Sequence, residues 1–236
     1  MTAGHLRGYR VAIKQRALLA EDKHERGNAI LDAAERLLRR SPDRVASVAE
    51  VADEAGLAKG TVYLYFPSKE ELLLALHERH VAEFFAALGG LLARSEPVSF
   101  DEILAITGTH MVEQPTFLPL ATRCFGIMGT QVPLDAAVAF KGRMAARMRD
   151  AAAGLERHFS ELPPGGGVPL LRHSYALILG LWQMSSTQVV ELPEGVDECP
   201  MVDFHYADEL ARGLRALWRG TVGTTPHVDA HGADTR

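Results

Sequence analysis

Apolar side chains recur every three or four residues along most of the chain, which is the spacing of one face of an α-helix. The clearest case is the stretch 28–40, where a single apolar stripe is formed by Ile30, Ala33, Ala34, Leu37 and Leu38. Similar patterns predict further helices over residues 47–55, 58–65, 68–92, 99–112, 117–130, 134–159, 168–190 and 204–218. No stretch alternates apolar and polar residues in the way that predicts a β-strand. The sequence therefore predicts an all-α protein.

The stretch 47–73 has the pattern of two short helices joined by a tight turn. Ser47 and Glu50 have the spacing of a capping box, in which the two side chains satisfy free backbone N–H groups at the start of a helix. Gly56 follows the first helix, and glycine adopts the positive φ that ends a helix without steric cost. Pro67 stops the second helix. A helix, a glycine turn and a second helix form the layout of a helix-turn-helix, whose second helix lies in the major groove of DNA.

The second of these helices has an unusual outward face. With Val62 and Phe66 pointing inward, that face carries Lys59, Gly60, Thr61, Tyr63 and Leu64. Tyrosine and leucine beside lysine and threonine are poorly suited to simple solvation but well suited to a DNA groove. Lysine and threonine reach phosphates there, and apolar atoms meet a thymine methyl group. Lys69 begins the next predicted helix, whose first N–H groups also favour a phosphate.

These residues resemble the TetR (tetracycline-repressor-like) family of transcriptional regulators. The matching positions, within about residues 28–75, are Ala55, Gly56, Leu57, Lys59, Gly60, Thr61, Val62, Tyr63, Tyr65, Phe66, Ser68, Lys69, Glu70 and Leu72. The residues expected to bind DNA are Ser47, Val48, Lys59, Gly60, Thr61, Tyr63, Leu64, Tyr65 and Lys69. The sequence departs from the family at Ala58, where serine or threonine often caps the second helix. That departure weakens the cap and leaves the predicted fold unchanged.

The resemblance also implies a homodimer, because the final two helices of each subunit pair across a two-fold axis in this family. Helix-turn-helix proteins usually need two heads, about 34–36 Å apart, to bind a palindromic site. The candidate dimer residues of the last two predicted helices are Ile178, Leu181, Leu210, Leu214, Leu217 and Trp218. The alternative is that these side chains only fill the core of one chain.

A small-molecule pocket is expected in the C-terminal region, since mixed methionine and aromatic linings suit adaptable apolar binding. The candidate lining residues are His110, Met111, Phe117, Cys124, Phe125, Met128, Phe140, Met144, Tyr175 and Trp182. Methionine and phenylalanine at helical spacing are equally consistent with ordinary core. The resemblance implies that a ligand shifts the helix over 68–92, changes the separation of the two heads and releases DNA. The ligand must then bind the released state more tightly than the DNA-bound state.

The charge distribution supports a division of the chain into parts. The net charge is −5, but residues 1–80 hold thirteen Lys/Arg and twelve Asp/Glu (+1), and the remainder hold twelve and eighteen (−6). We expect a flexible basic extension (1–22), a helix-turn-helix DNA-binding domain (23–75), a helical regulatory and dimerisation domain (76–220) and a disordered tail (221–236). The extension has four basic and no acidic side chains within residues 1–20, so a second reading is an arm that reaches DNA.

Other signals in the sequence are weak. Cys124 and Cys199 show no metal or redox spacing, which is typical of reduced thiols in a cytoplasmic protein. His77 and His80 lie three apart on a predicted helix, where we expect surface histidines rather than a metal site. The longest apolar run, residues 175–182, is too short for a membrane span, and the N-terminus lacks the apolar core of a signal peptide.

An enzyme has little support in this sequence. There is no phosphate-binding glycine loop and no nucleophile elbow. Glu21 and His24 match one half of a di-iron helix pattern, but a second copy is missing. We therefore expect no catalytic site and no cofactor. The expected function is a ligand-responsive repressor that binds a palindromic operator; the alternatives are an all-helical protein-binding adaptor or an enzyme of unknown chemistry.

Overall fold

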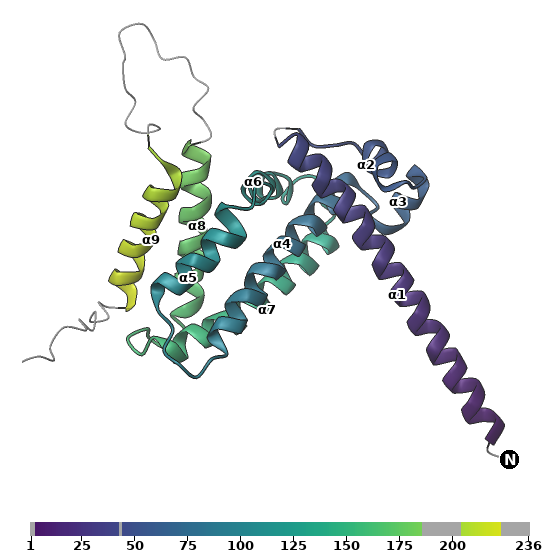
Figure 1. Cartoon of the computed structure of the whole chain (residues 1–236), viewed down its shortest axis with the longest axis horizontal. Coiled ribbons are helices and arrows are strands. Elements are labelled where there is room, and N and C mark those ends of the chain that lie inside the picture. The colour runs from purple at the N-terminus through teal and green to yellow at the C-terminus, as the bar shows by residue number, and fades with distance from the viewer. Residues whose placement is uncertain (1–2, 43, 186–203, 223–236) are drawn as a thin grey trace, which may run out of the picture. The chain divides into compact units, whose positions relative to one another are not determined.

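The computed structural model describes residues 3–42, 44–185 and 204–222, with side chains from Asp22 onward. These residues form helices and no strand, which confirms the all-α prediction (Figure 1). The elements are α1 (Ala3–Arg40), α2 (Val48–Ala55), α3 (Lys59–Tyr65), α4 (Lys69–Leu92), α5 (Phe100–Thr107), the π-helical turn η1 (Gly108–Val112), α6 (Phe117–Ile127), α7 (Leu134–His158), α8 (Gly167–Ser185) and α9 (Tyr206–Val222). None of the helices in the described ranges combines the length and the apolar character that crossing a membrane requires.

The first helix, α1, is longer than the apolar pattern predicts (Figure 1). The expected start at Asn28 is wrong, because α1 begins at Ala3 and no proline interrupts the backbone between these two residues. The described part of the predicted extension, residues 3–22, is therefore helical backbone. Its contact with DNA stays a prediction.

The predicted helix caps are present in the helix-turn-helix region. The hydroxyl of Ser47 accepts a hydrogen bond from the Glu50 backbone N–H (3.3 Å), and the Glu50 carboxylate accepts one from the Ser47 N–H (2.8 Å). Gly56 ends α2 with φ of 66°, the left-handed conformation that favours glycine. Ser68 accepts a hydrogen bond from the Glu71 N–H (3.1 Å), but the Glu71 carboxylate binds the Ser68 hydroxyl. Only one of the two hydrogen bonds of a capping box therefore forms at the start of α4.

Other helix boundaries differ from the predictions or lie outside the described residues. The helix expected over 99–112 divides, because α5 ends at Thr107 and continues as the π-helical turn η1. The described part of α8 ends at Ser185, so its predicted end at residue 190 lies outside the described residues, as does Cys199. α9 runs to Val222, which places the first two residues of the predicted tail in a helix; the rest of that tail lies outside the described residues.

The described residues form two compact units. Unit 1 contains the chain up to His80 together with Pro115–Ala137, and unit 2 contains Val81–Gln114 together with the described residues from Val138 onward. The side chains buried in unit 1 include Ile30, Ala33, Val51, Val62, Leu72, Leu76, Phe117, Leu118, Leu120 and Ala121. α6 thus belongs with the helix-turn-helix, and the domain limits expected from the sequence stay predictions.

Unit 1 also buries three polar or reactive side chains. His77 and His80 are each only 2% exposed, so the expectation of surface histidines is wrong. Both rings lie against the ring of Phe117, with centroid distances of 5.6 and 6.3 Å. Burial lowers the pKa of His77 to about 3 and raises the pKa of the Cys124 thiol to about 12. Within the described ranges no group of three or more His, Cys, Asp or Glu residues is arranged to hold a metal ion.

Unit 2 is built around the last two helices, α8 and α9. Trp218 is 3% exposed, its Nε1–H donates a hydrogen bond to the Ser174 hydroxyl (3.0 Å), and its ring lies 5.4 and 5.6 Å from the rings of Phe100 and Phe159. Four of the six predicted dimer residues are buried within this single chain, namely Ile178, Leu210, Leu214 and Trp218. Leu181 and Leu217 are half-buried. Packing within one chain already accounts for much of this apolar surface, and the dimer role of the six residues stays a prediction.

Candidate nucleic-acid interface

The helix α3 presents the outward face that the sequence predicts. Val62 is fully buried in unit 1, whereas Tyr63 is 43% and Leu64 is 79% exposed. Lys59 and Gly60 are exposed as well, and Thr61, Tyr65 and Phe66 are half-buried. The Nζ atom of Lys59 lies 5.9 Å from the centre of the Tyr63 ring, within the range of a cation–π contact. This contact places a positive charge beside the exposed aromatic ring.

The start of α3 has no side-chain cap, as the alanine at position 58 predicts. Ala58 has an extended backbone but makes no side-chain hydrogen bond to the helix. Gly60 follows in the first turn, and a Cβ atom added there would meet nothing within 4 Å. The fold of this chain therefore does not require glycine at this position. A close approach by a ligand backbone is one physical reason for a glycine at such a site.

The remaining predicted DNA-binding residues lie around α3. Ser47 is exposed, although its hydroxyl caps α2. Val48 is only 6% exposed, so its side chain belongs to the core of unit 1 and only its backbone remains for contact with DNA. Lys69 is half-buried at the first position of α4, and the acidic Glu70 and Glu71 follow it in the first turn. These acidic residues suit the positive end of the helix dipole.

Ion pairs hold α2 against α1. The carboxylate of Glu54 near the end of α2 accepts hydrogen bonds from Nε of Arg36 (2.7 Å) and from Nη1 and Nη2 of Arg40 (2.8 and 3.1 Å). At the start of α2, Nη2 of Arg44 lies 2.7 Å from Oε1 of Glu50. The guanidinium of Arg44 lowers the pKa of the Glu50 carboxyl to about 2. Both ends of α2 are thus tied by arginines, which fixes the helix that precedes α3.

The residues predicted to bind a small molecule are divided between the two units. Phe117, Cys124, Phe125 and Met128 belong to unit 1, whereas the other six belong to unit 2: His110, Met111, Phe140, Met144, Tyr175 and Trp182. Phe117, Met111 and Phe140 are buried, and Phe125 is 60% exposed. Their role in ligand binding stays a prediction.

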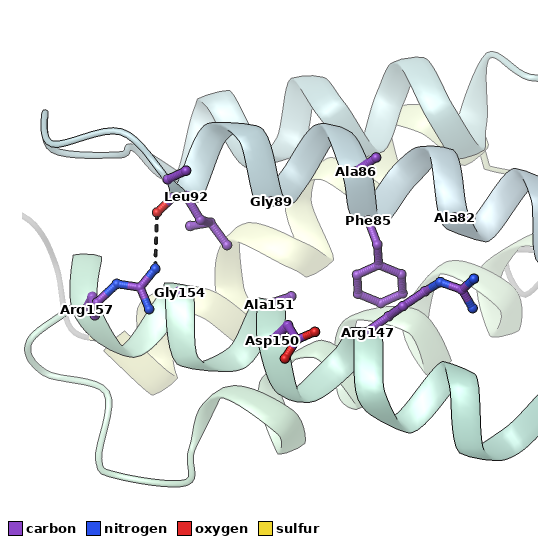
Figure 2. A pocket seen from close by; sticks show the side chains of 11 residues that line it. Ala82, Phe85, Ala86, Gly89, Leu92, Arg147, Asp150, Ala151, Gly154 and Arg157 are labelled. Carbon is purple, nitrogen blue, oxygen red and sulfur yellow. Dashed lines mark hydrogen bonds between the residues drawn. The ribbon is translucent and has the colours of Figure 1, made fainter. Parts of the chain in front are cut away.

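A groove that the sequence analysis missed lies between α4 and α7 in unit 2 (Figure 2). It has a volume of about 420 Å³ and is lined by Ala82, Phe85, Ala86, Gly89, Leu92, Ala93, Arg147, Asp150, Ala151, Gly154 and Arg157. At one end the helices approach so closely that a Cβ atom on Gly154 would lie 2.9 Å from Leu92 side-chain atoms. There Nη2 of Arg157 donates a hydrogen bond to the Leu92 carbonyl (3.4 Å). The small residues spaced three or four apart on α4 were the available sequence signal.

Two family models match the chain, one for each region. The model described as "Bacterial regulatory proteins, tetR family" matches residues 30–76, and the model described as "Tetracyclin repressor-like, C-terminal domain" matches residues 78–224. The first match contains α2, α3 and the exposed face described above. The second alone spans more than half of the chain.

Individual relatives agree with these matches over shorter spans. The chain is 45% identical over 64 residues to the HTH-type transcriptional regulator EthR of Mycobacterium tuberculosis, which is 27% of this chain and 30% of that protein. It is 36% identical over 55 residues to the fatty acid metabolism regulator protein of Bacillus subtilis, which is 23% of this chain and 28% of that protein. The chain therefore matches less than a third of the length of these curated relatives.

Solved structures show the same fold along most of the chain. A TetR-family transcriptional regulator from Streptomyces coelicolor has a TM-score of 0.54 at 19% identity, covering 83% of this chain and 99% of that structure. SmeT, the repressor of the Stenotrophomonas maltophilia multidrug efflux pump SmeDEF, has a TM-score of 0.53 at 20% identity, covering 87% and 96%. At these identities the likeness shows the fold alone. With a helix-turn-helix match at one end and a family-specific match along the remainder, this chain belongs to the TetR family of transcriptional regulators.

Proposed function

We propose that this protein is a repressor that binds an inverted-repeat operator as a homodimer through α3 and leaves the DNA when a small, largely apolar molecule binds. The observation that carries the proposal is the face of α3, where Tyr63 and Leu64 are exposed beside Lys59. Lysine suits DNA phosphates, and the exposed tyrosine and leucine suit base edges and thymine methyl groups. Family membership supports DNA as the partner.

The geometry of helix-turn-helix recognition supports the proposed dimer. A single seven-residue helix reads only a few base pairs, and two heads about one DNA turn apart give a symmetric protein a palindromic site. Of the six candidate dimer residues on α8 and α9, only Leu181 and Leu217 are half-buried and so leave apolar surface for a second subunit.

The groove between α4 and α7 supports the ligand-binding part of the proposal. Its volume of about 420 Å³ falls within the range of small-molecule sites, and its floor combines Phe85 with small apolar side chains. α4 also begins directly after the helix-turn-helix, so a ligand against this helix contacts the element that leads to α3. Release of DNA requires the ligand to favour the state that binds DNA weakly.

The decisive experiment is the selection of bound duplexes from a random DNA pool at near-physiological salt, because phosphate contacts alone weaken steeply as salt rises. Two leucines give a matched pair of variants: Leu64 on α3 is 79% exposed, and Leu134 at the start of α7 is 80% exposed. We expect wild type and Leu134→Ala to enrich the same inverted repeat, and Leu64→Ala and Tyr63→Ala to lose it. Absence of enrichment by folded wild-type protein would contradict the proposal and favour a protein-binding adaptor.

A further inference from the structure

One carboxylate in unit 1 brings together three helices. Glu35, near the end of α1, has a side chain only 14% exposed. Its oxygens accept hydrogen bonds from Nη2 of Arg79 on α4 (2.6 Å) and from the hydroxyl of Thr116, the residue before α6 (3.4 Å). Nε2 of His80, also on α4, lies 3.3 Å from Oε1 of Glu35. α4 and the start of α6 are therefore both tied to α1 through the same side chain.

Neighbouring side chains on α1 reinforce this junction. Nη2 of Arg39, one turn further along α1, lies 3.0 Å from Oε1 of Glu35. Nη1 of Arg79 also reaches Oδ1 of Asp32, one turn earlier, at 2.5 Å. The close contacts of His80 and Arg79 lower the pKa of Glu35 to about 2, against the opposing effect of burial. Glu35 is thus a charged acceptor at the pH of a cell, surrounded by donors.

Basic side chains on the same part of α1 bind the helix-turn-helix. Arg36 and Arg40 both bind the carboxylate of Glu54 on α2, and Nη2 of Arg36 also donates to the Glu54 carbonyl (3.3 Å). Glu54 lies two residues before Gly56, the glycine of the turn that leads into α3. Within residues 32–40, the acidic side chains therefore bind Arg79 of α4, and the basic side chains bind Glu54 of α2.

Charged hydrogen bonds of this kind set orientation as well as stability. Forked contacts between guanidinium and carboxylate groups have a preferred geometry, so they add orientation to the packing of the apolar side chains. When a helix is held by such contacts on two sides, a shift of the neighbour on one side moves the helix and so moves the neighbour on the other side. In unit 1 that helix is α1, between α4 with α6 on one side and α2 on the other.

We propose that Glu35 is a positioning residue for DNA binding: through the charged relay Arg79–Glu35–α1–Glu54 it sets the orientation in which α2 and α3 meet the operator. The inference rests on the operator binding proposed above. Glu35 does not touch DNA in this account and acts only through α1 and Glu54. A role confined to the stability of unit 1 is the competing account, and the two differ in what happens when stability is restored.

The test compares three variants at matched temperature: Glu35→Gln, the paired neutralisation Glu35→Gln/Arg79→Gln, and Glu54→Gln at the other end of the relay. Removing one partner of a buried ion pair strands the other charge, whereas removing both avoids that penalty. The double variant therefore recovers much of the melting temperature that Glu35→Gln loses. The control is Asp101→Asn, which breaks the exposed contact between Arg215 and Asp101 (2.9 Å) in unit 2.

The readouts are the affinity for the selected operator and the affinity for a scrambled duplex at low salt. We expect the three variants to bind the operator roughly 3- to 30-fold more weakly, which is the range for residues that couple two sites. The scrambled duplex should bind as it does to wild type, because the basic and apolar face of α3 is unchanged. Asp101→Asn should match wild type in both measurements.

Three results would overturn the relay. These are an unchanged operator affinity in Glu35→Gln, an operator affinity in the double variant that recovers together with its melting temperature, and wild-type operator binding by Glu54→Gln. Loss of the scrambled duplex in parallel with the operator would also reject a positioning role, because the whole head would then be damaged. If wild type enriches no operator, the proposed function and the relay fail together; if wild type enriches one and Glu35→Gln binds it normally, the relay alone fails.

Discussion

The two units of this protein are both helical, but different interactions hold them together. In unit 1, the short helix α2 is fixed by arginines around Glu54, and α4 is fixed to α1 by Arg79 and His80 around Glu35. Both carboxylates are largely shielded from solvent, with side chains 18% and 14% exposed. In unit 2, the central contact is the fully packed Trp218 between two phenylalanine rings.

The difference follows from the lengths of the helices, which determine how much apolar surface is available to fix their orientation. α2 and α3 have eight and seven residues, so each buries only a few apolar side chains. Directional ion pairs therefore supply part of the orientation that a larger core would supply. α8 and α9, with 19 and 17 residues, bury long apolar faces against each other and need fewer such contacts. Orientation in unit 1 should respond to charge, and stability in unit 2 should respond to packing.

The largest expected effect comes from removing the aromatic centre of unit 2. Trp218→Ala should lower the free energy of unfolding of unit 2 by about 3–5 kcal/mol, because a large buried ring leaves a cavity. Urea unfolding followed by circular dichroism measures the loss. Trp218→Phe should cost less, since it keeps apolar bulk and loses the bond to Ser174. Equal losses in both variants would mean that the hydrogen bond, rather than packing, dominates this centre.

A smaller effect should come from overfilling the close contact between α4 and α7. Gly154→Ala places a Cβ atom 2.9 Å from Cβ of Leu92 and should cost about 1–3 kcal/mol of stability. Gly142 lies on the same helix, and an added Cβ there meets nothing within 4 Å. Gly142→Ala should therefore stabilise the helix by up to about 1 kcal/mol. Thermal melting of both variants distinguishes them, and a destabilised Gly142→Ala would show that helix propensity is not the deciding factor.

Unit 1 should instead respond to the titration of its charges. The folded protein holds the pKa of Glu35 at about 2, below the ordinary value of 4.5, so the unfolded chain takes up its proton at higher pH. The resulting stability is present above pH 4.5 and is lost as pH falls from 4.5 towards 2. After allowance for solvent screening, we expect Glu35 to contribute about 1–2 kcal/mol of this loss. Unfolding free energies measured against pH should decline less steeply in Glu35→Gln, and parallel curves would contradict the prediction.

The smallest effect on stability should occur on the DNA-binding face itself. Gly60→Ala should raise the stability of α3 by about 0.5–1 kcal/mol, since the added methyl meets nothing and alanine favours a helix. The same variant should weaken operator binding, because the methyl occupies space at the proposed DNA surface. Gly56→Ala is the contrasting variant, as φ of 66° strains alanine and should destabilise the turn. Melting temperature and operator affinity together test this, and unchanged operator binding by Gly60→Ala would remove Gly60 from the proposed interface.

Local signals explain why the helix-turn-helix could be predicted from the sequence. The capping box of Ser47 and Glu50, the positive φ of Gly56 and the burial of Val62 all depend on residues within one or two turns of one another. Such signals can be recognised from a short stretch of sequence alone. The expected exposed face of α3 follows from them directly.

The Glu35 junction could not be predicted in the same way, because its partners are distant in sequence. Arg79 lies 44 residues and Thr116 lies 81 residues from Glu35. The spacing of His77 and His80 fits an exposed face of a long helix as well as a covered one. Only the positions of α1 and α6 around α4 show that this face is covered.

The buried thiol of Cys124 has a practical consequence for measuring motion in this protein. Alkylating reagents attack the thiolate, and a pKa of about 12 leaves almost none of it at neutral pH. Once Cys199 is replaced by serine, a cysteine introduced at the exposed Asp53 becomes the preferred point of attachment for a maleimide dye. A fluorophore at that position reports the rotation of α2 in solution without any need to remove the native core cysteine.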